Sequence, residues 1–267
     1  MGTQDIVASV SDLKWSHPSF VVCFSGLTLF RGMPSGGTLA TILNLFDYYS
    51  VKEVANAFSP WALSPVPGPK PSRGPSLITK LLGLRFDPDL GTLTTFVAAT
   101  GNTAIVHRTW GLQDGGRYYG PRFHYSEYIQ VRNALVGVGI HFLLALAGLA
   151  LLFPPARWLA KKFVYQPGQG ASKESSRNEA LEYRSIATAD QDIRDPSRAI
   201  AKFRYDGALY YLTGIFLAEA AMVILRDEEM VRRLGGGVLT PAMLGQPFIE
   251  RLKNAGVVFE VGMLPNL

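Results

Sequence analysis

The stretch Ala134–Phe153, ALVGVGIHFLLALAGLALLF, is the strongest single signal in the sequence. It carries no formal charge at neutral pH, and His141 is its only ionisable residue. As an α-helix it would extend about 30 Å, which is enough to cross the hydrocarbon core of a bilayer. The alternative is the core helix of a soluble domain, in which its alanines and glycines would allow close packing.

The flanks of this stretch favour a membrane over a protein interior. Pro154 and Pro155 end the apolar run, and the basic, aromatic segment Arg157–Tyr165 follows, as is typical at a lipid headgroup layer. A soluble core helix normally carries a polar stripe, for which only His141 and glycines are available here. We therefore expect a helix that dips into one leaflet or spans the bilayer. The contacts would be made by Leu144, Leu149, Trp158, Lys161 and Lys162.

The segments around this helix predict an α+β fold, with a mixed β-sheet and flanking helices. β-Branched and aromatic runs predict strands at 20–30, 122–129, 180–187, 200–205 and 257–261. Apolar residues at helical spacing predict helices at 38–57, 76–84, 209–225 and 240–254. The segment 92–109 fits either a strand or a helix. Six prolines within 59–75 predict a loop, anchored at its start by Trp61 and Leu63.

Composition excludes several classes of function. The 26 basic residues exceed the 21 acidic ones only modestly and are scattered, so no nucleic-acid partner is expected. Cys23 is the only cysteine, which rules out a disulfide or a cysteine-based metal site within one chain and indicates an intracellular location. The start of the chain does not resemble a signal peptide. No two of the four histidines have the i, i+4 spacing of a helical zinc site, so no metal is expected.

The glycines do not form a dinucleotide-binding turn. Such a turn needs a strand, the pattern Gly-x-Gly-x-x-Gly and a helix whose N-terminus holds the pyrophosphate. Gly168 and Gly170 lie in a polar linker, and Gly235–Gly237 precede an expected helix that starts with a proline. Only 19 residues precede the first expected strand. We therefore expect no cofactor-binding residues in this chain.

Several segments, taken in order, resemble the part of saccharopine dehydrogenase-like oxidoreductases that follows their nucleotide-binding domain. The resemblance covers nearly the whole chain from about residue 20, and its specificity lies in the order of the motifs. The matching segments are Met33–Thr38, Ala62–Pro65, Asn102–Leu112, Tyr119–Tyr128 and Gly236–Ala242. Residues 1–19 match nothing in the family, so the expected division is an unmatched segment at 1–19 and one substrate-side domain at 20–267.

The resemblance implies an oxidoreductase of lipid metabolism, associated with a membrane or lipid droplet and similar to the trans-acting enoyl reductases of bacterial lipid synthesis. In the family, NAD(P) binds to an N-terminal Rossmann domain, so this chain would correspond to a truncated Rossmann enzyme. Two functions follow as expectations. The first is the substrate and membrane half of an oxidoreductase that acts on a lipid-like substrate. The alternative is a non-enzymatic membrane or lipid-droplet protein that has lost the cofactor half.

The turn Ser35-Gly36-Gly37-Thr38 is one candidate for contact with a substrate. Its glycines permit positive φ and a close approach of the backbone, and Thr38 could cap the helix that follows. The free N–H groups of that helix end could hold a carboxyl or carbonyl oxygen. The alternative is an ordinary tight turn between a strand and a helix, which the sequence favours.

The aromatic segment Tyr118–Tyr128 is the other candidate. Residues two apart on a strand share a face, so Tyr125 and Glu127 could act together on a polar group. A tyrosine in this position could donate a proton, as in reductases. The sequence favours the alternative, an aromatic strand face packed against a helix, and the catalytic residues remain unassigned at this stage.

Overall fold

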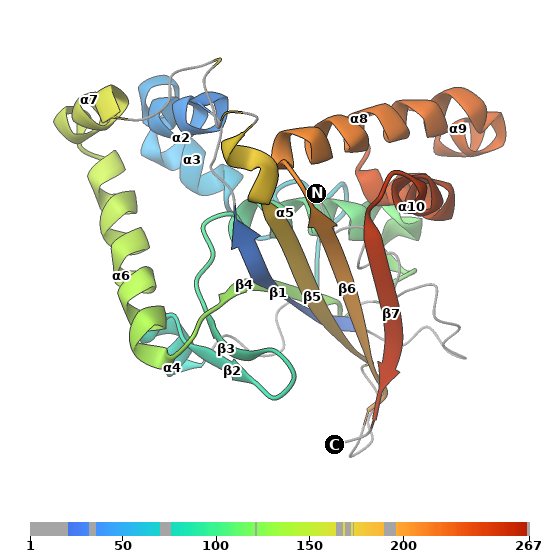
Figure 1. Ribbon diagram of the computed structural model, residues 1–267, viewed down its shortest axis with the longest axis horizontal. Helices are drawn as coiled ribbons and strands as arrows, with labels where there is room; N and C mark the ends of the chain where they lie inside the picture. Colours follow the sequence, from blue (N-terminus) through green and yellow to red (C-terminus); the bar gives the residue numbers. More distant parts are fainter. Residues whose placement is uncertain are drawn as a thin grey trace.

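The computed structural model describes residues 21–31, 36–69, 76–120, 122–163, 168, 172, 174–189 and 196–265. These residues form a mixed β-sheet with helices on it and beside it (Figure 1), which confirms the α+β class. The strands are β1 (Val21–Arg31), β2 (Arg85–Asp87), β3 (Gly91–Thr94), β4 (His124–Gln130), β5 (Ala180–Ala189), β6 (Arg198–Asp206) and β7 (Val258–Leu264). The α-helices are α2 (Gly36–Tyr48), α3 (Val51–Ala57), α4 (Leu77–Leu82), α5 (Ala99–Leu112), α6 (Ala134–Leu151), α7 (Pro154–Phe163), α8 (Leu209–Arg226), α9 (Glu228–Leu234) and α10 (Gly245–Asn254).

The sheet consists of two three-stranded antiparallel groups that β1 joins into one. The strand order is β2-β3-β4-β1-β5-β6-β7. β1 is parallel to β4, with Ser25 opposite Glu127, and antiparallel to β5, with Ser25 opposite Ser185. All five expected strands belong to this sheet. β4 and β5 therefore lie about 10 Å apart across a single strand, within reach of two long side chains.

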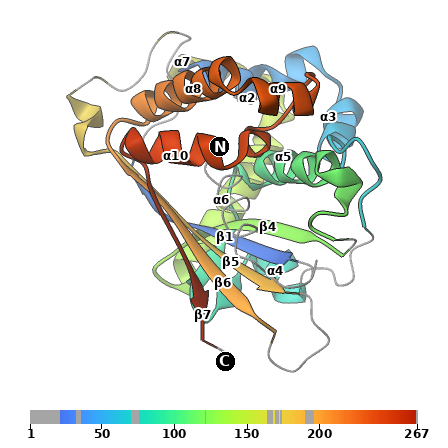
Figure 2. The same ribbon diagram turned by 90° about the vertical axis from the view of Figure 1, so that its right-hand side faces the viewer.

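The main hydrophobic core lies between one face of the sheet and the helices α5, α8 and α10 (Figure 2). Phe203 of β6 is fully buried there, and its ring stacks on Phe216 of α8 and meets Phe259 of β7 edge-on. Phe248 of α10 packs against Phe216 from the other side. These aromatic contacts attach the C-terminal helices to the sheet.

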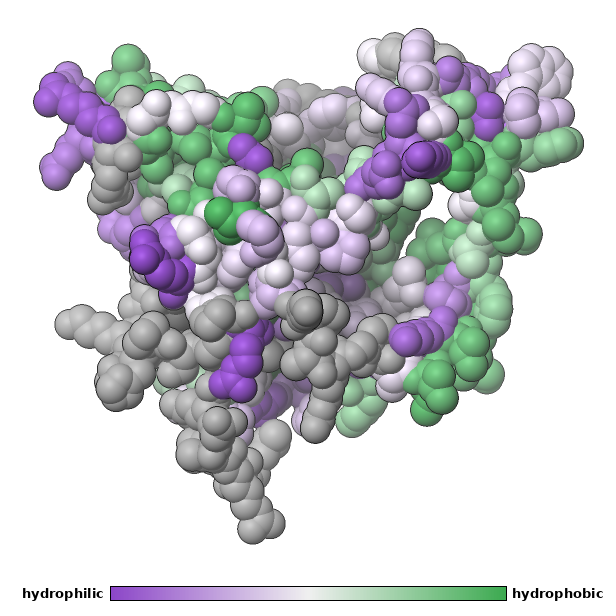
Figure 3. Space-filling view, turned by 180° about the vertical axis from the view of Figure 1, so that it is seen from behind, coloured by the Kyte–Doolittle hydropathy of each residue, from purple (hydrophilic) through white to green (hydrophobic). Residues whose placement is uncertain are grey.

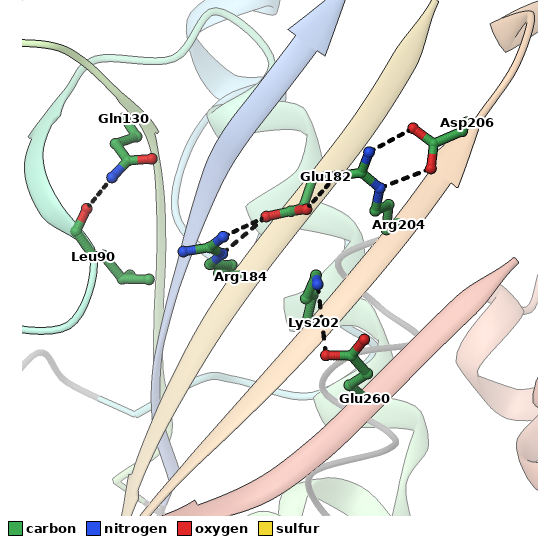
Figure 4. Close-up of polar contacts among 8 residues, drawn as sticks. All are labelled: Leu90, Gln130, Glu182, Arg184, Lys202, Arg204, Asp206 and Glu260. Atoms are coloured by element: carbon green, nitrogen blue, oxygen red, sulfur yellow. Dashed lines mark hydrogen bonds and ion pairs between the residues drawn. The ribbon is translucent and has the colours of Figure 1, made fainter.

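The opposite face of β5, β6 and β7 carries charged side chains, as the period of two along a strand requires (Figure 4). Glu182 of β5 lies between two arginines, with Arg184 Nη2 at 2.8 Å and Arg204 Nη1 at 3.0 Å. Arg204 also contacts Asp206 at 2.7 Å. These ion pairs keep this part of the face polar, and the main apolar core lies on the helical side.

The expected helix at 38–57 is two helices, because a cap interrupts it. The Ser50 side chain accepts a hydrogen bond from the backbone N–H of Glu53, whose carboxylate accepts one from the backbone N–H of Ser50. This reciprocal capping box starts α3 where α2 has ended. At the far end of the chain, the expected helix at 240–254 is also divided. Pro241–Leu244 form a 3₁₀ helix, η3, and α10 follows it.

The ambiguous segment 92–109 contains both structures. β3 ends at Thr94 and α5 begins at Ala99, so the strand and the helix are separated by only four residues. The proline-rich loop before it is anchored by Trp61, as expected, whereas the Leu63 side chain is exposed. Trp61 has φ 64°, and a Cβ atom on Gly68 would lie 1.9 Å from its ring. The loop therefore needs a glycine at 68 to accept the tryptophan.

α6 stands at the side of the molecule and links the α4 region to α7 (Figure 1). Two contacts hold its first half, a hydrogen bond from Thr94 Oγ1 to the Gly137 carbonyl at 2.8 Å and one between Thr95 Oγ1 and His141 Nδ1 at 2.8 Å. Gly137 is its only buried residue. The expected helix at 134–153 is thus confirmed over Ala134–Leu151, and most of its apolar surface is exposed.

α7 continues the chain after a turn, because prolines are tolerated in the first turn of a helix. Arg157 was expected to meet lipid phosphates, but it is buried and bonded to Asp47 Oδ1 at 3.0 Å and to the Leu151 carbonyl at 2.6 Å. Lys161 contacts the other oxygen of Asp47 at 2.7 Å. These two side chains attach α7 to α2.

We predict that Phe203→Ala lowers the free energy of unfolding by about 3 to 5 kcal/mol, because it leaves a cavity where three aromatic rings meet. Urea denaturation followed by circular dichroism would measure the loss. Phe86→Ala is the matched control, since Phe86 is 75% exposed and its truncation should change stability by less than about 0.5 kcal/mol. Equal losses for the two variants would contradict the position of the core.

Candidate functional site

A pocket of about 270 Å³ lies between α5, β4 and the end of α3. The α5 wall consists of small residues and one histidine, which share a helix face: Ala99, Thr100, Thr103, Ala104 and His107. The β4 wall is formed by the four consecutive residues Tyr125–Tyr128. Phe58, Ser59 and Pro60 close a third side, and the exposed Phe58 lies at the surface of the pocket.

The pocket exists because β3 is shorter than β4. β3 pairs with β4 only at Leu93 opposite Gln130 and Thr94 opposite Ile129. The chain then leaves the sheet and begins α5, so the segment Tyr125–Tyr128 faces a helix wall instead of a strand. A strand edge and a helix cannot approach as closely as two paired strands, and the remaining space is the pocket.

Glu127 is the acidic residue of this pocket, and it is buried with three polar partners. Asn102 of α5 donates from Nδ2 to Glu127 Oε1 at 3.0 Å, and the Tyr125 hydroxyl donates to Glu127 Oε2 at 3.3 Å. The hydroxyl of Tyr183, on β5, also bonds to the carboxyl. The three partners come from α5, β4 and β5, so the tertiary fold assembles the cluster.

Burial changes the proton affinity of these groups. Removal of Glu127 from water raises the pKa of its carboxyl to about 7, against the lowering effect of its bonds to Asn102 and the two tyrosines. Burial and the neighbouring Glu127 raise the pKa of Tyr183, so this phenol stays protonated. The Glu127 carboxyl therefore exchanges a proton near neutral pH, which is the range in which general acids and bases work.

His107 lines the pocket with a neutral imidazole ring. Burial lowers the pKa of its imidazole to about 4, so the ring carries no charge at neutral pH. It stacks on Trp61 with ring centroids 3.6 Å apart and an interplanar angle of 13°. His107, with Trp61 stacked on it, is one of the residues that line the pocket. Such a lining favours an apolar or planar ligand group.

The structure separates the residues that the sequence suggested for the substrate. Tyr125 and Glu127 lie in the pocket and bond to each other. Ser35 lies outside the described residues. α2 begins at Gly36, so Thr38 lies in its first turn, and the expected cap at Thr38 is wrong. Neither Gly37 nor Thr38 lines the pocket.

The residues suggested for membrane contact also differ from one another. Leu149 and Trp158 are more than 60% exposed, whereas Leu144 is half-buried. Lys161 is engaged by Asp47. The ammonium of Lys162 lies 3.6 Å from the centroid of the Trp158 ring, in a cation–π contact.

Sequence reasoning missed Asn102, Tyr183 and His107. Asn102 and His107 lie in the segment whose secondary structure the sequence left open, so no helix face could be assigned to them. Tyr183 is 56 positions from Glu127 in the sequence, and only the register of β4, β1 and β5 brings the two together.

Gly235–Gly237 have positive φ but follow α9 and precede η3, so they are not the turn from a strand to a helix that holds a pyrophosphate. In the described part of the chain, no group of three or more His, Cys, Asp or Glu side chains could hold a metal ion.

Comparison with known proteins finds relatives among mycobacterial proteins. A Mycobacterium tuberculosis protein, named provisionally as a trans-acting enoyl reductase, is 31% identical over 250 residues, which cover 88% of this chain and 58% of that protein. The trans-acting enoyl reductase of Mycobacterium bovis is 27% identical, with 84% of this chain and 55% of the relative covered. That of Mycobacterium ulcerans is 28% identical, with the same coverage. No protein-family model and no solved structure matches the chain.

These relatives correct the interpretation of the sequence. The assignment to the saccharopine dehydrogenase-like family is wrong, because the relatives are named trans-acting enoyl reductases. The two functions derived from that assignment are therefore wrong as well. Nothing in the comparisons supports an association with lipid droplets or a truncated Rossmann enzyme. The chain is similar, over most of its own length and about half of theirs, to mycobacterial proteins named trans-acting enoyl reductase.

Proposed function

We propose that this chain binds the enoyl group of a lipid-like acyl substrate in the pocket beside β4 and takes part in its reduction. The observation that carries the proposal is the combination of apolar walls with a buried acid that exchanges its proton near neutral pH. Enoyl reduction needs both features, a surface for the acyl chain and a proton for the carbon next to the carbonyl group. The names of the relatives supply the reaction class.

The shape of the site supports an acyl ligand. Ala99 and Ala104 leave space on the α5 wall, while Phe58 and Pro60 offer apolar contact at the surface. Lipid-like chains gain about 25 cal/mol for each Å² of apolar surface removed from water. The polar groups of Tyr125 and Glu127 lie on the opposite wall, where they would meet the carbonyl end of the same ligand.

We predict that Ala104→Trp fills the pocket and weakens the binding of an octenoyl-pantetheine thioester at least tenfold, which corresponds to about 1.4 kcal/mol. Isothermal titration calorimetry on the full chain would measure the affinity. Ala218→Trp is the matched control, because Ala218 is exposed on α8, far along the chain from the pocket residues. The proposal would be refuted if the unmodified chain did not bind the thioester, or if the Ala104→Trp variant bound it equally well.

A second proposal is that the chain contacts a membrane. It is supported by the exposure of α6. By length and composition alone α6 and α8 could each cross a bilayer, and 6% of the apolar window of α6 is buried against 17% of that of α8. Figure 3 shows hydrophobic side chains gathered along the edge of the molecule where α6 and α4 lie. These include Leu77, Ile78, Leu81, Leu135, Leu143, Leu146 and Leu149. We propose that this surface enters one leaflet of a bilayer.

The groups at the end of α6 suit a bilayer surface. α6 has 18 residues, so it extends about 27 Å, slightly less than a hydrocarbon core of about 30 Å. Trp158, Phe163 and Lys162 of α7 are exposed beside it, and a tryptophan paired with a lysine is typical of the headgroup layer. A membrane position would bring the chain close to a lipid-like substrate.

We predict that Leu146→Asp together with Leu149→Asp releases the chain from vesicles of phosphatidylcholine and phosphatidylglycerol in a flotation assay. Each aspartate in hydrocarbon costs roughly 2.5 to 3.5 kcal/mol on insertion scales. The control is Leu217→Asp with Leu225→Asp, on exposed positions of α8, which should float like the unmodified chain. If the unmodified chain stays with the soluble fraction, α6 is covered by protein and the membrane proposal is wrong.

A further inference from the structure

We infer that Glu127 is the proton donor of the pocket, which gives its proton to the α-carbon of the bound enoyl group, while Asn102, Tyr125 and Tyr183 hold its carboxyl group in position. This inference rests on the proposed function and adds to it the catalytic residue and the step that this residue performs. It is carried by the geometry of the cluster. Glu127 lines the pocket, and its partners approach from three separate elements.

The position of Glu127 distinguishes it from the other buried acids of the described chain. Glu182 is equally buried but is neutralised by Arg184 and Arg204. Glu179 and Asp87 accept hydrogen bonds from backbone N–H groups. Among the described residues Glu127 forms no ion pair, and its hydrogen-bond partners there are neutral donors. A carboxyl group with neutral partners in a dry site retains its proton more readily than one paired with arginine.

The partners suit both states of the carboxyl group. When Glu127 loses its proton, the resulting carboxylate accepts hydrogen bonds from Asn102, Tyr125 and Tyr183, so the charge is stabilised without water. His107, the one basic side chain among the described residues that line the pocket, is neutral at neutral pH. None of the described residues that line the pocket carries a positive charge at neutral pH that would hold the carboxylate in the ionised state. This favours return of the proton after each cycle.

The proposed step transfers one hydride and one proton to the enoyl group. A hydride from a donor of the reduced-nicotinamide class, supplied as a co-reactant, adds to the β-carbon. The π electrons of the C=C bond then move toward the carbonyl oxygen and form an enolate. The α-carbon takes the proton from Glu127, so a C–H bond forms as the O–H bond breaks. Glu127 is left as a carboxylate and recovers a proton from solvent. The acyl chain is reduced by two electrons and the nicotinamide is oxidised.

The reverse of the proton step can be measured without any hydride donor. A saturated acyl thioester bound in the pocket would lose an α-proton to the Glu127 carboxylate and regain a deuteron in heavy water. We predict that the full chain exchanges the α-protons of octanoyl-pantetheine, followed by proton NMR, and that Glu127→Gln reduces the rate by about 10²-fold or more, the usual contribution of a general acid or base. Glu182→Gln, which removes an acid of the same 4% exposure outside the pocket, should keep the exchange.

Three further variants separate the roles within the cluster. Tyr125→Phe should slow the exchange by less than about tenfold if Tyr125 positions the carboxyl group; loss of exchange in Tyr125→Phe but not in Glu127→Gln would make the tyrosine the donor and overturn the inference.

Exchange by the carboxylate should increase as the pH rises through about 7. Asn102→Ala removes a bond that lowers the pKa of Glu127, so it should move this increase to higher pH, whereas a merely structural role for Asn102 would lower the rate at every pH. Asn102→Asp places a negative charge beside Glu127, so it should also move the increase in exchange rate to higher pH.

Stability offers a readout that does not depend on activity. The pKa of the Glu127 carboxyl is about 7 in the folded chain and 4.5 in an exposed reference, so the folded state binds more protons between these values. The free energy of unfolding contributed by this group therefore decreases as the pH rises from 4.5 to about 7. Glu127→Gln should lack this decrease in a series of thermal denaturation curves. Identical pH profiles for the two proteins would show that the carboxyl is not held protonated and would overturn the inference.

The outcomes also distinguish this inference from the proposed function. Binding of octanoyl-pantetheine without exchange would reject Glu127 as the donor and leave the acyl site in place. Absence of binding would reject both. Exchange that persists in Glu127→Gln, with the variant folded by circular dichroism, would assign the proton to another group and overturn the inference.

Discussion

The burial of one carboxyl group organises the candidate site. A carboxylate without partners in an apolar interior is too costly to persist, so Glu127 must either bond to donors or keep its proton. The fold provides for both states, because Asn102, Tyr125 and Tyr183 reach it from α5, β4 and β5. The positions of these three elements are therefore linked through a single group, and a change in any one of them would alter its proton affinity.

The pocket beside Glu127 follows from the unequal lengths of β3 and β4. β3 stops pairing with β4 after Thr94, so this strand does not cover the segment Tyr125–Tyr128 that lines the pocket. The early departure of the chain instead places the small residues of α5 opposite this segment. His107, on which Trp61 stacks, also lines the pocket, so apolar side chains and a buried acid share one cavity.

The exposed helix α6 is attached to this site through the same strand. Thr94, the last residue of β3, bonds to the Gly137 carbonyl, and Thr95 bonds to His141. A surface that contacts lipid through α6 would thus be joined to the edge of the sheet that forms the pocket. Arg157 and Asp47 attach the other end of the same unit to α2. Placement of α6 at a bilayer would therefore bring the pocket close to a substrate that resides there.

The sequence by itself determined the α+β class, the five expected strands and α6, because periods of two and 3.6 depend only on the local order of apolar residues. It also placed Tyr125 and Glu127 on one face. It did not determine where α2 and α3 divide or which half of 92–109 is helical, since a cap and a short loop decide these points. The pairing of Glu127 with Asn102 and Tyr183 depended on tertiary structure alone. Strand register and the path of α5 bring those residues together. Neither can be predicted from the spacing of residues along the sequence.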